Sequence, residues 1–335
     1  EGMLKTDLNA FLDGDNPWAI ENVENVEKDD ADMFLTSQGD ALPDAPLEQC
    51  LPEVDTKFAY KRRVAILAFD IQRRGDTADF PHIERQYPNL LKDYVDRERL
   101  IVDTATNLRL LNNTDANAGA WVESERSQIM NLAENLNAQF IVTGTVEDMS
   151  VVNPDMNAMN FALDVVVRKK WLGKIRRNLA VTLNVFDGGT GVLIKRQTFA
   201  GDTYVNSRIL QKRKSLSKAF FRSQYGELMT AILKQQGDFF LSSLDCIPLQ
   251  AKVIAVDKNG VTLNAGIESL ILSGDKLKVF RRVKIDWSNN SRENYRLERY
   301  GDLTISRSSP LSAYGVFKDK GMSSGINPGD IVQAW

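Results

Sequence analysis

The chain has 335 residues, 43% of them hydrophobic, which is enough for two or three domains that each have a core of their own. No stretch approaches the roughly 18 uninterrupted apolar residues of a membrane helix, so the sequence predicts no transmembrane segment. Two cysteines and one histidine are too few for a disulfide scaffold or a Cys/His zinc site.

Charge is distributed unevenly along the chain. Residues 1–56 hold 15 Asp and Glu and only two Lys, whereas residues 57–335 hold 30 acidic and 40 basic residues. The first segment is also rich in Pro, Gly and Asn and poor in apolar residues, which predicts an extended acidic arm. The arm is either a solvated tail or a segment that lies on a basic surface, its own or a neighbour's. Because the chain begins with Glu1 rather than Met, a removed signal peptide would fit.

Residues 57–247 predict an α/β domain. The apolar run Val64–Phe69 is typical of a buried strand, a helix is expected near Asn89–Arg97, and Arg99–Thr104 predicts a second strand. This succession indicates a parallel βαβ unit. A helix over about Val122–Asn137 and a buried strand over Phe140–Val146 follow.

Further along, the hydrophobic period changes to two. Alternation over Phe161–Val167 and Leu179–Val185 predicts strands, and Asp187–Gly191 predicts a hairpin turn after the second of them. A long helix is expected over Ser215–Leu241, with Ser215 or Ser217 as its N-cap.

Residues 248–335 predict a small all-β barrel or sandwich. Two strands flank the turn Asn259-Gly260. An internal repeat follows, in which Gly266–Phe280 matches Gly321–Trp335 at five of fifteen positions, including the pairs Gly274-Asp275 and Gly329-Asp330. We expect both Gly-Asp pairs to be turns. The predicted fold class is thus α+β or α/β: a mixed-sheet domain followed by a small all-β domain.

The sequence predicts no catalytic residue, no cofactor and no metal. Any Ser-His-Asp or Cys-His site would have to use His82, which has no paired ligand at helical spacing. Asp187–Gly191 is glycine-rich but lacks the Gly-Lys-Ser/Thr of a phosphate-binding loop. The Gly-Asp pairs do not have the spacing of a calcium-binding EF-hand.

Two basic runs are candidate sites of partner contact. They comprise Arg168, Lys169, Lys170, Lys174, Arg176 and Arg177 in the first run, and Arg208, Lys212, Arg213 and Lys214 in the second. The first surrounds Trp171, an arrangement that single-stranded nucleic acid can bind. However, the isoelectric point is about 5.5 and no nucleic-acid-binding module is recognisable. Solvated faces, or contact with a protein or an anionic surface, are the favoured interpretations.

The two cysteines bracket the middle region. Cys50 precedes its first strand and Cys246 follows its last helix. In a reducing compartment they would be two thiols, whereas in an oxidising compartment they could form one disulfide.

Three features in a fixed order carry a resemblance to a known family. A cysteine precedes Tyr60–Phe69, the stretch Leu132–Val146 is similar to a helix-to-strand segment of TolB N-terminal domains, and Asp245–Val253 leads into the Gly-Asp β-domain. Over about residues 50–335, this order resembles the middle and C-terminal domains of the flagellar assembly protein FlgT.

The resemblance implies a periplasmic, non-enzymatic structural protein of the sodium-driven polar flagellar motor. Family members build the H ring of the basal body and help to recruit the stator-associated proteins MotX and MotY. The resemblance also implies a TolB-N-like middle domain, self-association in a ring and a disulfide between Cys50 and Cys246. Residues 1–49 are too short and too acidic for the folded N-terminal domain of that family.

Two other functions stay open at this point. One is a TolB-like or curli-secretion-like envelope protein that binds other proteins but is unrelated to flagella. The other is a hydrolase with two carboxylates in a deep pocket, about 5–10 Å apart as in glycosidases.

Overall fold

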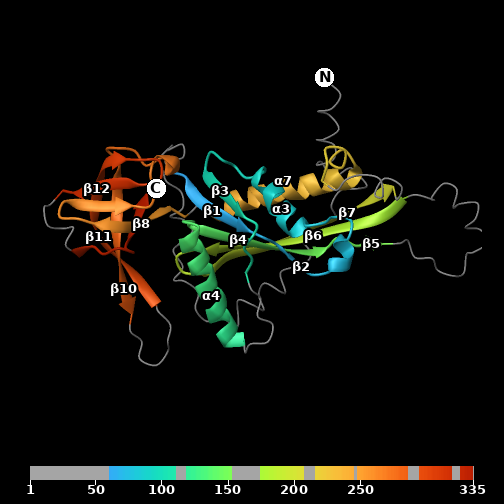
Figure 1. Cartoon of the computed structure of the whole chain (residues 1–335), viewed down its shortest axis with the longest axis horizontal. Coiled ribbons are helices and arrows are strands. Elements are labelled where there is room, and N and C mark those ends of the chain that lie inside the picture. The colour runs from blue at the N-terminus through green and yellow to red at the C-terminus, as the bar shows by residue number, and fades with distance from the viewer. Residues whose placement is uncertain are drawn as a thin grey trace, which may run out of the picture.

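The computed structural model describes residues 60–110, 118–152, 174–206, 216–244, 247–285, 294–318 and 325–334. Figure 1 shows two bodies along the long axis, a twisted mixed sheet flanked by helices and a small barrel of strands. The predicted fold class, a mixed-sheet body followed by a small all-β body, is confirmed. The predicted arm and the predicted strand over Phe161–Val167 lie outside the described residues.

The larger body is a seven-stranded sheet in the order β3-β1-β4-β6-β5, with β2 paired to β4 and β7 paired to β6. Its strands are β1 (Arg62–Leu67), β2 (Asp70–Ile71), β3 (Leu100–Ala105), β4 (Phe140–Asp148), β5 (Val151–Val152), β6 (Lys174–Asp187) and β7 (Leu193–Asn206). Strands β3, β1 and β4 are parallel, which confirms the predicted βαβ unit. β6 adds antiparallel to β4 and forms a long hairpin with β7.

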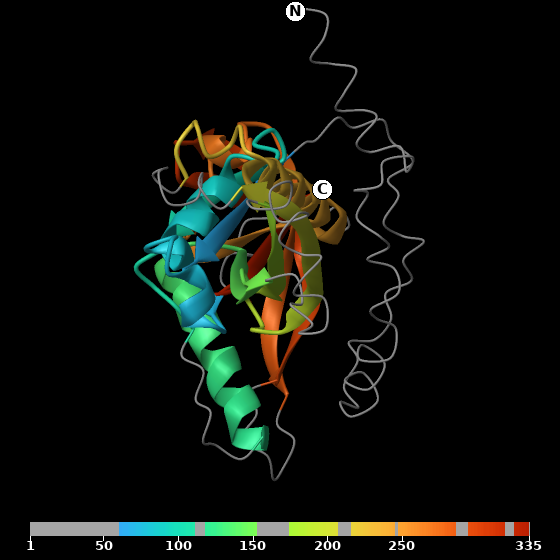
Figure 2. The same cartoon turned by 90° about the vertical axis from the view of Figure 1, so that its right-hand side faces the viewer.

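Helices cover both faces of this sheet. α3 (Ile83–Lys92) and α7 (Gln224–Leu244) lie on one face and α4 (Ala118–Asn135) lies on the other (Figures 1 and 2). The core beneath α3 and α7 is the larger one and includes the fully buried Ile66 and Leu233. A smaller apolar cluster around Ile141 faces α4. Because alternate residues of a strand face opposite sides, β1 and β4 contribute to both cores.

Helix α3 begins earlier than the sequence predicts. The expected span was Asn89–Arg97, whereas the helix begins at Ile83 and contains Pro88. Because proline has no N–H, residue 88 leaves the carbonyl of Glu84 without its usual helical donor. The backbone N–H of Phe69 donates to that carbonyl instead, at 2.9 Å. The carbonyl that the proline releases therefore ties α3 to the segment that follows β1.

Helix α7 begins at Gln224, later than predicted, so Ser217 is not its N-cap, and Ser215 lies outside the described residues. The cap is Ser223, whose side-chain oxygen accepts a hydrogen bond from the N–H of Gly226 at 3.3 Å. Ser217 instead caps a separate turn that ends at Phe220. Both serines fit the same N-cap preference, so sequence alone could not place the boundary between the turn and the helix.

Gly237 lets α7 pack closely on the segment after α3. A Cβ at this position would lie 2.3 Å from the backbone oxygen of Tyr94. We expect Gly237→Ala to lower the free energy of unfolding by about 2 kcal/mol, although alanine is the better helix former by about 1 kcal/mol. Urea denaturation measures the change. Gln235→Ala, an exposed position on the same helix, is the control, and equal stability of the two variants would contradict this packing.

The smaller body is a closed barrel in the strand order β10-β11-β12-β9-β8-β13. Its strands are β8 (Leu249–Val256), β9 (Gly260–Leu263), β10 (Lys276–Ile285), β11 (Asn294–Ser308), β12 (Ala313–Phe317) and β13 (Ile331–Ala334). The predicted turn at Asn259-Gly260 joins β8 and β9, and the side chain of Asp257 accepts the N–H groups of both turn residues. The core of the barrel is separate from those of the sheet.

The barrel has an internal two-fold arrangement that explains the sequence repeat. The unit β8-β9-β10 recurs as β11-β12-β13, and β10 pairs antiparallel with its own counterpart β13. In that pairing Lys278 lies opposite Gln333, the residue with which it aligns in the repeat. The counterparts β9 and β12 are also paired, around Thr262 and Tyr314.

The two Gly-Asp pairs are turns, as predicted. Gly274 and Gly329 share a φ of +97°, which glycine adopts without strain. The aspartate after each glycine accepts a backbone N–H from three residues earlier, at 2.8 Å in both copies. These side chains serve to hold the turns.

Candidate functional site

Most of the predicted basic residues lie outside the described residues. This holds for Arg168, Lys169 and Lys170 and for the whole second run, Arg208, Lys212, Arg213 and Lys214, and it holds also for both cysteines, Cys50 and Cys246. Lys174 begins β6, but its side chain is not described. The exposed guanidinium of Arg176 forms two hydrogen bonds with the carboxylate of Asp202, at 2.7 and 2.9 Å. Arg176 therefore lies on the surface, as a contact residue must.

Arg177 does not lie on the surface, so its assignment to a contact patch was wrong. Its side chain is 1% exposed, because β6 turns residue 177 toward α7 and residue 176 away from it. The guanidinium lies 4.8 Å from the ring centre of Phe80 and 4.6 Å from that of Tyr225. Both of its terminal nitrogens bind the carboxylate of Asp79. Arg177 thus fastens the loop before α3 to the sheet.

A pocket of about 390 Å³ lies beyond the carboxyl end of β1. From β1 the chain crosses to β3 through α3 on one face of the sheet, and from β3 to β4 through α4 on the other. Such a reversal of direction opens a crevice at the carboxyl ends of the strands, where open α/β sheets bind ligands. The lining residues come from both crossings and from β4: Phe69, Asp70, Ile71, Gln72, Arg74, Glu84, Arg109 and Thr145.

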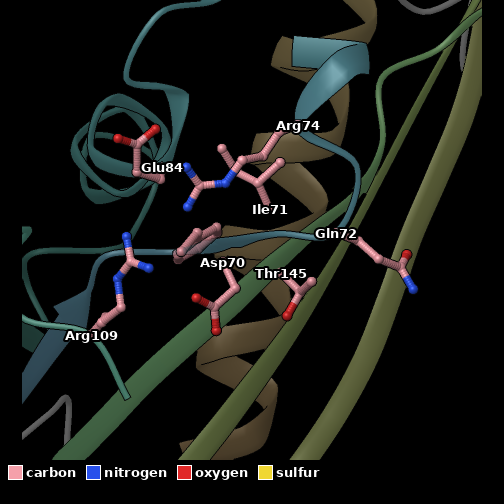
Figure 3. A pocket seen from close by; sticks show the side chains of 8 residues that line it. Asp70, Ile71, Gln72, Arg74, Glu84, Arg109 and Thr145 are labelled. Carbon is pink, nitrogen blue, oxygen red and sulfur yellow. The ribbon is translucent and has the colours of Figure 1, made fainter. Parts of the chain in front are cut away.

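The polar side chains of this pocket are two acids, two arginines, one amide and one hydroxyl (Figure 3). Burial raises the pKa of the Asp70 carboxyl, and the nearby charge of Arg109 partly offsets the effect. Asp70 and Thr145 lie directly opposite each other on β2 and β4, so both face the same side. The arrangement places a partly desolvated carboxylate beside two cations in one hollow.

A strip of polar side chains continues from Asp70 across the sheet on the face that carries α4. Thr145 lies opposite Thr182, and Thr182 lies opposite Thr198. The hydroxyls of Thr182 and Thr198 are 2.6 Å apart, and Thr182 also donates to the carboxylate of Glu147 at 2.5 Å. Since these groups bond one another, the strip is an ordered polar surface next to the pocket.

Sequence reasoning missed the pocket residues. Asp70 follows the apolar run that ends at Phe69, and an acid directly after a parallel strand marks the end of a sheet where sites form. Nothing local singles out Arg74 or Arg109: Arg74 follows Arg73 at the start of a 3-10 turn, and Arg109 lies between two leucines after β3. The topology brings them together, and the order of strands in the sheet was not predicted.

Outside this pocket, the described residues offer few side chains for metal binding or for histidine chemistry. Within those ranges no three His, Cys, Asp or Glu side chains stand close enough to hold a metal ion. His82 has a side chain that is 74% exposed and lies 3.7 Å from Glu84. No helix in the described part of the chain is long and apolar enough to span a membrane.

Side-chain amides join the two bodies at a short junction. Gln139, just before β4, donates to the backbone oxygen of Pro248 at 2.8 Å and accepts from the N–H of Gln250 at 3.1 Å. Asn137 and Asn264 form a second link, in which each side chain donates to the other residue, at 3.2 and 2.5 Å. The barrel is therefore held to the sheet by several directional contacts.

Two adjacent arginines of β1 strengthen the junction from opposite faces of the sheet. Arg62 is buried and donates to the backbone oxygens of Leu244, the last residue of α7, and of Ile247, which leads into the barrel. Arg63 points to the other face and binds Glu268 of the barrel at 2.8 Å. Strand β1 thus contacts both the end of α7 and the barrel.

Tyr60 anchors the start of β1 to the barrel. Its ring packs on the barrel core, and its hydroxyl bonds to the carboxylate of Asp275. Burial, together with the charge and hydrogen bond of Asp275, raises the pKa of Tyr60 to about 12. The residue thereby adds a contact between the bodies that is sensitive to alkaline pH.

We expect the stability of the protein to fall as the pH rises from 10 to 12. Because the pKa of Tyr60 in the folded state exceeds its ordinary value of 10.0, the folded chain keeps a proton that the unfolded chain loses. The contribution is complete below pH 10 and is lost as the pH passes the raised pKa. Ultraviolet titration of the tyrosinates should show one group near pH 12 that is absent from Tyr60→Phe and shifts toward 10 in Asp275→Asn. An unchanged curve in Tyr60→Phe would contradict the assignment.

Comparisons with solved structures give distant neighbours. A hypothetical protein of Chlamydia trachomatis, CT253, is 15% identical and has a TM-score of 0.36; the match covers 56% of this chain and 98% of that one. The PelC dodecamer of Paraburkholderia phytofirmans is 17% identical, with coverages of 56% and 89% and a TM-score of 0.29. For the lipoprotein GNA1162 of Neisseria meningitidis the identity is 9%, the coverages are 53% and 99%, and the TM-score is 0.27. At these scores the neighbours carry no conclusion about this chain.

A family comparison is more informative. No curated protein matches the chain. The family model "Flagellar assembly protein T, middle domain" matches residues 56–203, which span the sheet from β1 into β7. The resemblance drawn from the sequence is therefore confirmed for this part of the chain: residues 56–203 match the middle domain of the flagellar assembly protein T family.

Proposed function

We propose that the chain is a non-catalytic, periplasmic assembly protein of the flagellar basal body that contributes to the H ring. In this role it binds ring components, further copies of itself and stator-associated proteins of the MotX and MotY type. The observation that carries the proposal is the match of residues 56–203 to the flagellar assembly protein T middle domain.

The build of the molecule supports a scaffolding role. An assembly protein holds its partners at fixed positions relative to one another. This requires that its own binding surfaces do not move relative to each other. Here Arg63, Gln139 and the Asn137–Asn264 pair join sheet and barrel through hydrogen bonds. The two bodies would then present their outer faces as one unit.

We propose a division of the chain into an acidic arm (1–56), a middle domain (57–247) and a C-terminal β-domain (248–335). Separate hydrophobic cores in the sheet and the barrel support the boundary at 247/248. Limited proteolysis that cuts within the barrel strands before the arm would argue against this division.

The basic segments that hold Arg168–Arg176 and Arg208–Lys214 are the proposed contact sites for partners, without Arg177. Neutralising Lys169 and Lys170 together should weaken capture of partners and leave thermal stability unchanged. The Cys50–Cys246 disulfide is a further proposal, which non-reducing mass mapping of periplasmic material tests directly. Two free thiols there would reject it.

The decisive experiment is a gene deletion in the flagellated source bacterium. Electron microscopy of purified basal bodies should show loss or thinning of the H ring, and MotX and MotY should no longer co-purify with them. Re-expression of the full chain should restore both. A deletion strain with an intact ring and normal retention of both proteins would reject the proposed function.

A further inference from the structure

The pocket beyond β1 is built like a ligand site, and flagellar assembly as described above makes no use of it. It lies in the crevice where the chain direction reverses, and it draws side chains from three separate segments. The hydrogen bond from the Phe69 N–H to the Glu84 carbonyl fixes the two sides of the pocket relative to each other. Its shape therefore does not depend on one loop.

Two arginines in this pocket have guanidinium N–H groups that are available to bind a ligand. The guanidinium groups of Arg74 and Arg109 form no hydrogen bond and no ion pair within 4.0 Å with any described side chain. Both side chains line the same hollow (Figure 3). Two positive charges in one pocket, which Asp70 beside Arg109 balances only in part, favour the binding of a further anion.

The two acids of the pocket balance these charges only in part, Asp70 through its proximity to Arg109. The carboxylate of Glu84 lies near His82, at 3.7 Å, and forms no ion pair with Arg74 or Arg109 among the described residues. Asp70 points with Thr145 to the other side of the pocket (Figure 3). A planar anion with two oxygens matches the paired donors of a guanidinium, and a carboxylate is the smallest common group of that shape.

We propose that this pocket binds a carboxylate group between Arg74 and Arg109, while Asp70 and Thr145 accept or donate hydrogen bonds to the atoms beside it. The carboxylate belongs either to a small organic acid or to an acidic side chain of a protein segment. The chain itself supplies such a segment, because residues 1–56 hold 15 Asp and Glu. The inference extends beyond the assembly role, since a chain without that role would still bind the ligand.

Isothermal titration calorimetry of the full chain at constant ionic strength tests the proposal with two probes. The first probe is malonate, a small dicarboxylate. The second is a peptide of residues 20–33, which contains six acids, compared with the same peptide in which each acid is replaced by its amide. We expect Arg74→Gln and Arg109→Gln each to weaken binding about tenfold, because each removes one charge-assisted pair of hydrogen bonds.

Two further variants distinguish binding in this pocket from nonspecific attraction of the probes to positive charge on the protein. Asp70→Asn should tighten binding about threefold, because it removes a like charge next to the ligand. Arg85→Gln removes an exposed arginine of α3 outside the pocket and should change binding less than twofold.

Each outcome has a definite meaning. Binding of malonate alone assigns the pocket to small acids, and binding of the acidic peptide but not of its amide form assigns it to protein side chains. Binding of both probes, with the same dependence on the variants, supports the shared carboxylate chemistry. Binding of neither probe, or binding that Arg74→Gln and Arg109→Gln leave unchanged, overturns the proposal.

Discussion

Replacing Arg177 by methionine is expected to lower the free energy of unfolding by about 3 kcal/mol, one of the two largest single effects that we predict. The guanidinium is 1% exposed, binds Asp79 with both terminal nitrogens and packs against the rings of Phe80 and Tyr225. Methionine fills part of the space but leaves the carboxylate without its partner. The expected loss lies at the low end for buried ion pairs, because Asp79 is 40% exposed and regains water.

Urea denaturation of three variants separates this pair from ordinary surface charge. Arg176→Met is the matched control, since its exposed pair with Asp202 should contribute less than about 1 kcal/mol. Asp79→Asn should also destabilise, because it leaves a buried charge without its counter-ion. The double variant of Arg177→Met and Asp79→Asn should lose less than the sum of the single losses. If Arg176→Met and Arg177→Met lower the free energy of unfolding equally, the burial of Arg177 does not contribute to stability.

This pair of arginines illustrates what the sequence could and could not establish. The alternation over Leu179–Val185 predicts a strand, and the structure has one over Lys174–Asp187. A basic run before that strand invites a single interpretation as a surface patch. The strand, however, turns neighbouring residues to opposite faces, so Arg176 and Arg177 have different environments. The sequence alone does not reveal that an aspartate 98 positions earlier meets the inward one.

The two bodies differ in how far local patterns determine them. In the barrel, Asn259-Gly260 and both Gly-Asp pairs predict turns that the structure contains, because each depends on residues a few positions apart. In the sheet, the longer strands and the helices were expected in the correct order, but the short strands β2 and β5 and the start of α7 were not, and neither was the start of α3. The start of α3 depends on a contact between Phe69 and Glu84, and the pocket depends on two crossings of the sheet and on β4. Such long-range contacts leave no local pattern.

The second large effect is expected at Arg62. We predict that Arg62→Met lowers the free energy of unfolding by about 3 kcal/mol. The buried guanidinium donates to the oxygens of Leu244 and Ile247, so the variant leaves two carbonyls at the end of α7 without this donor. It also removes a cation from the negative end of a 21-residue helix, where positive charge is favourable.

Hydrogen exchange distinguishes this role from a general loss of stability. The amides of the last turn of α7 and of Ile247 should exchange faster in Arg62→Met, well before those at the centre of the sheet. Arg63→Met is the matched control: its partners Asp103 and Glu268 are about half exposed, so a loss under about 1 kcal/mol is expected. Arg62→Lys keeps the charge with a different donor geometry and should recover part of the loss.

The comparison of these variants also tests the idea of one rigid unit. Arg62 fixes the end of α7, from which the chain enters the barrel, and Gln139 bonds to the barrel itself. If these contacts hold the junction, Arg62→Met should loosen it and separate a single calorimetric transition into two, with the barrel and the sheet unfolding apart. An assembly protein whose bodies move independently would not place both outer faces at fixed positions for its partners. A single sharp transition in Arg62→Met, with unchanged exchange at the end of α7, would therefore contradict both the predicted effect and the scaffolding argument that depends on it.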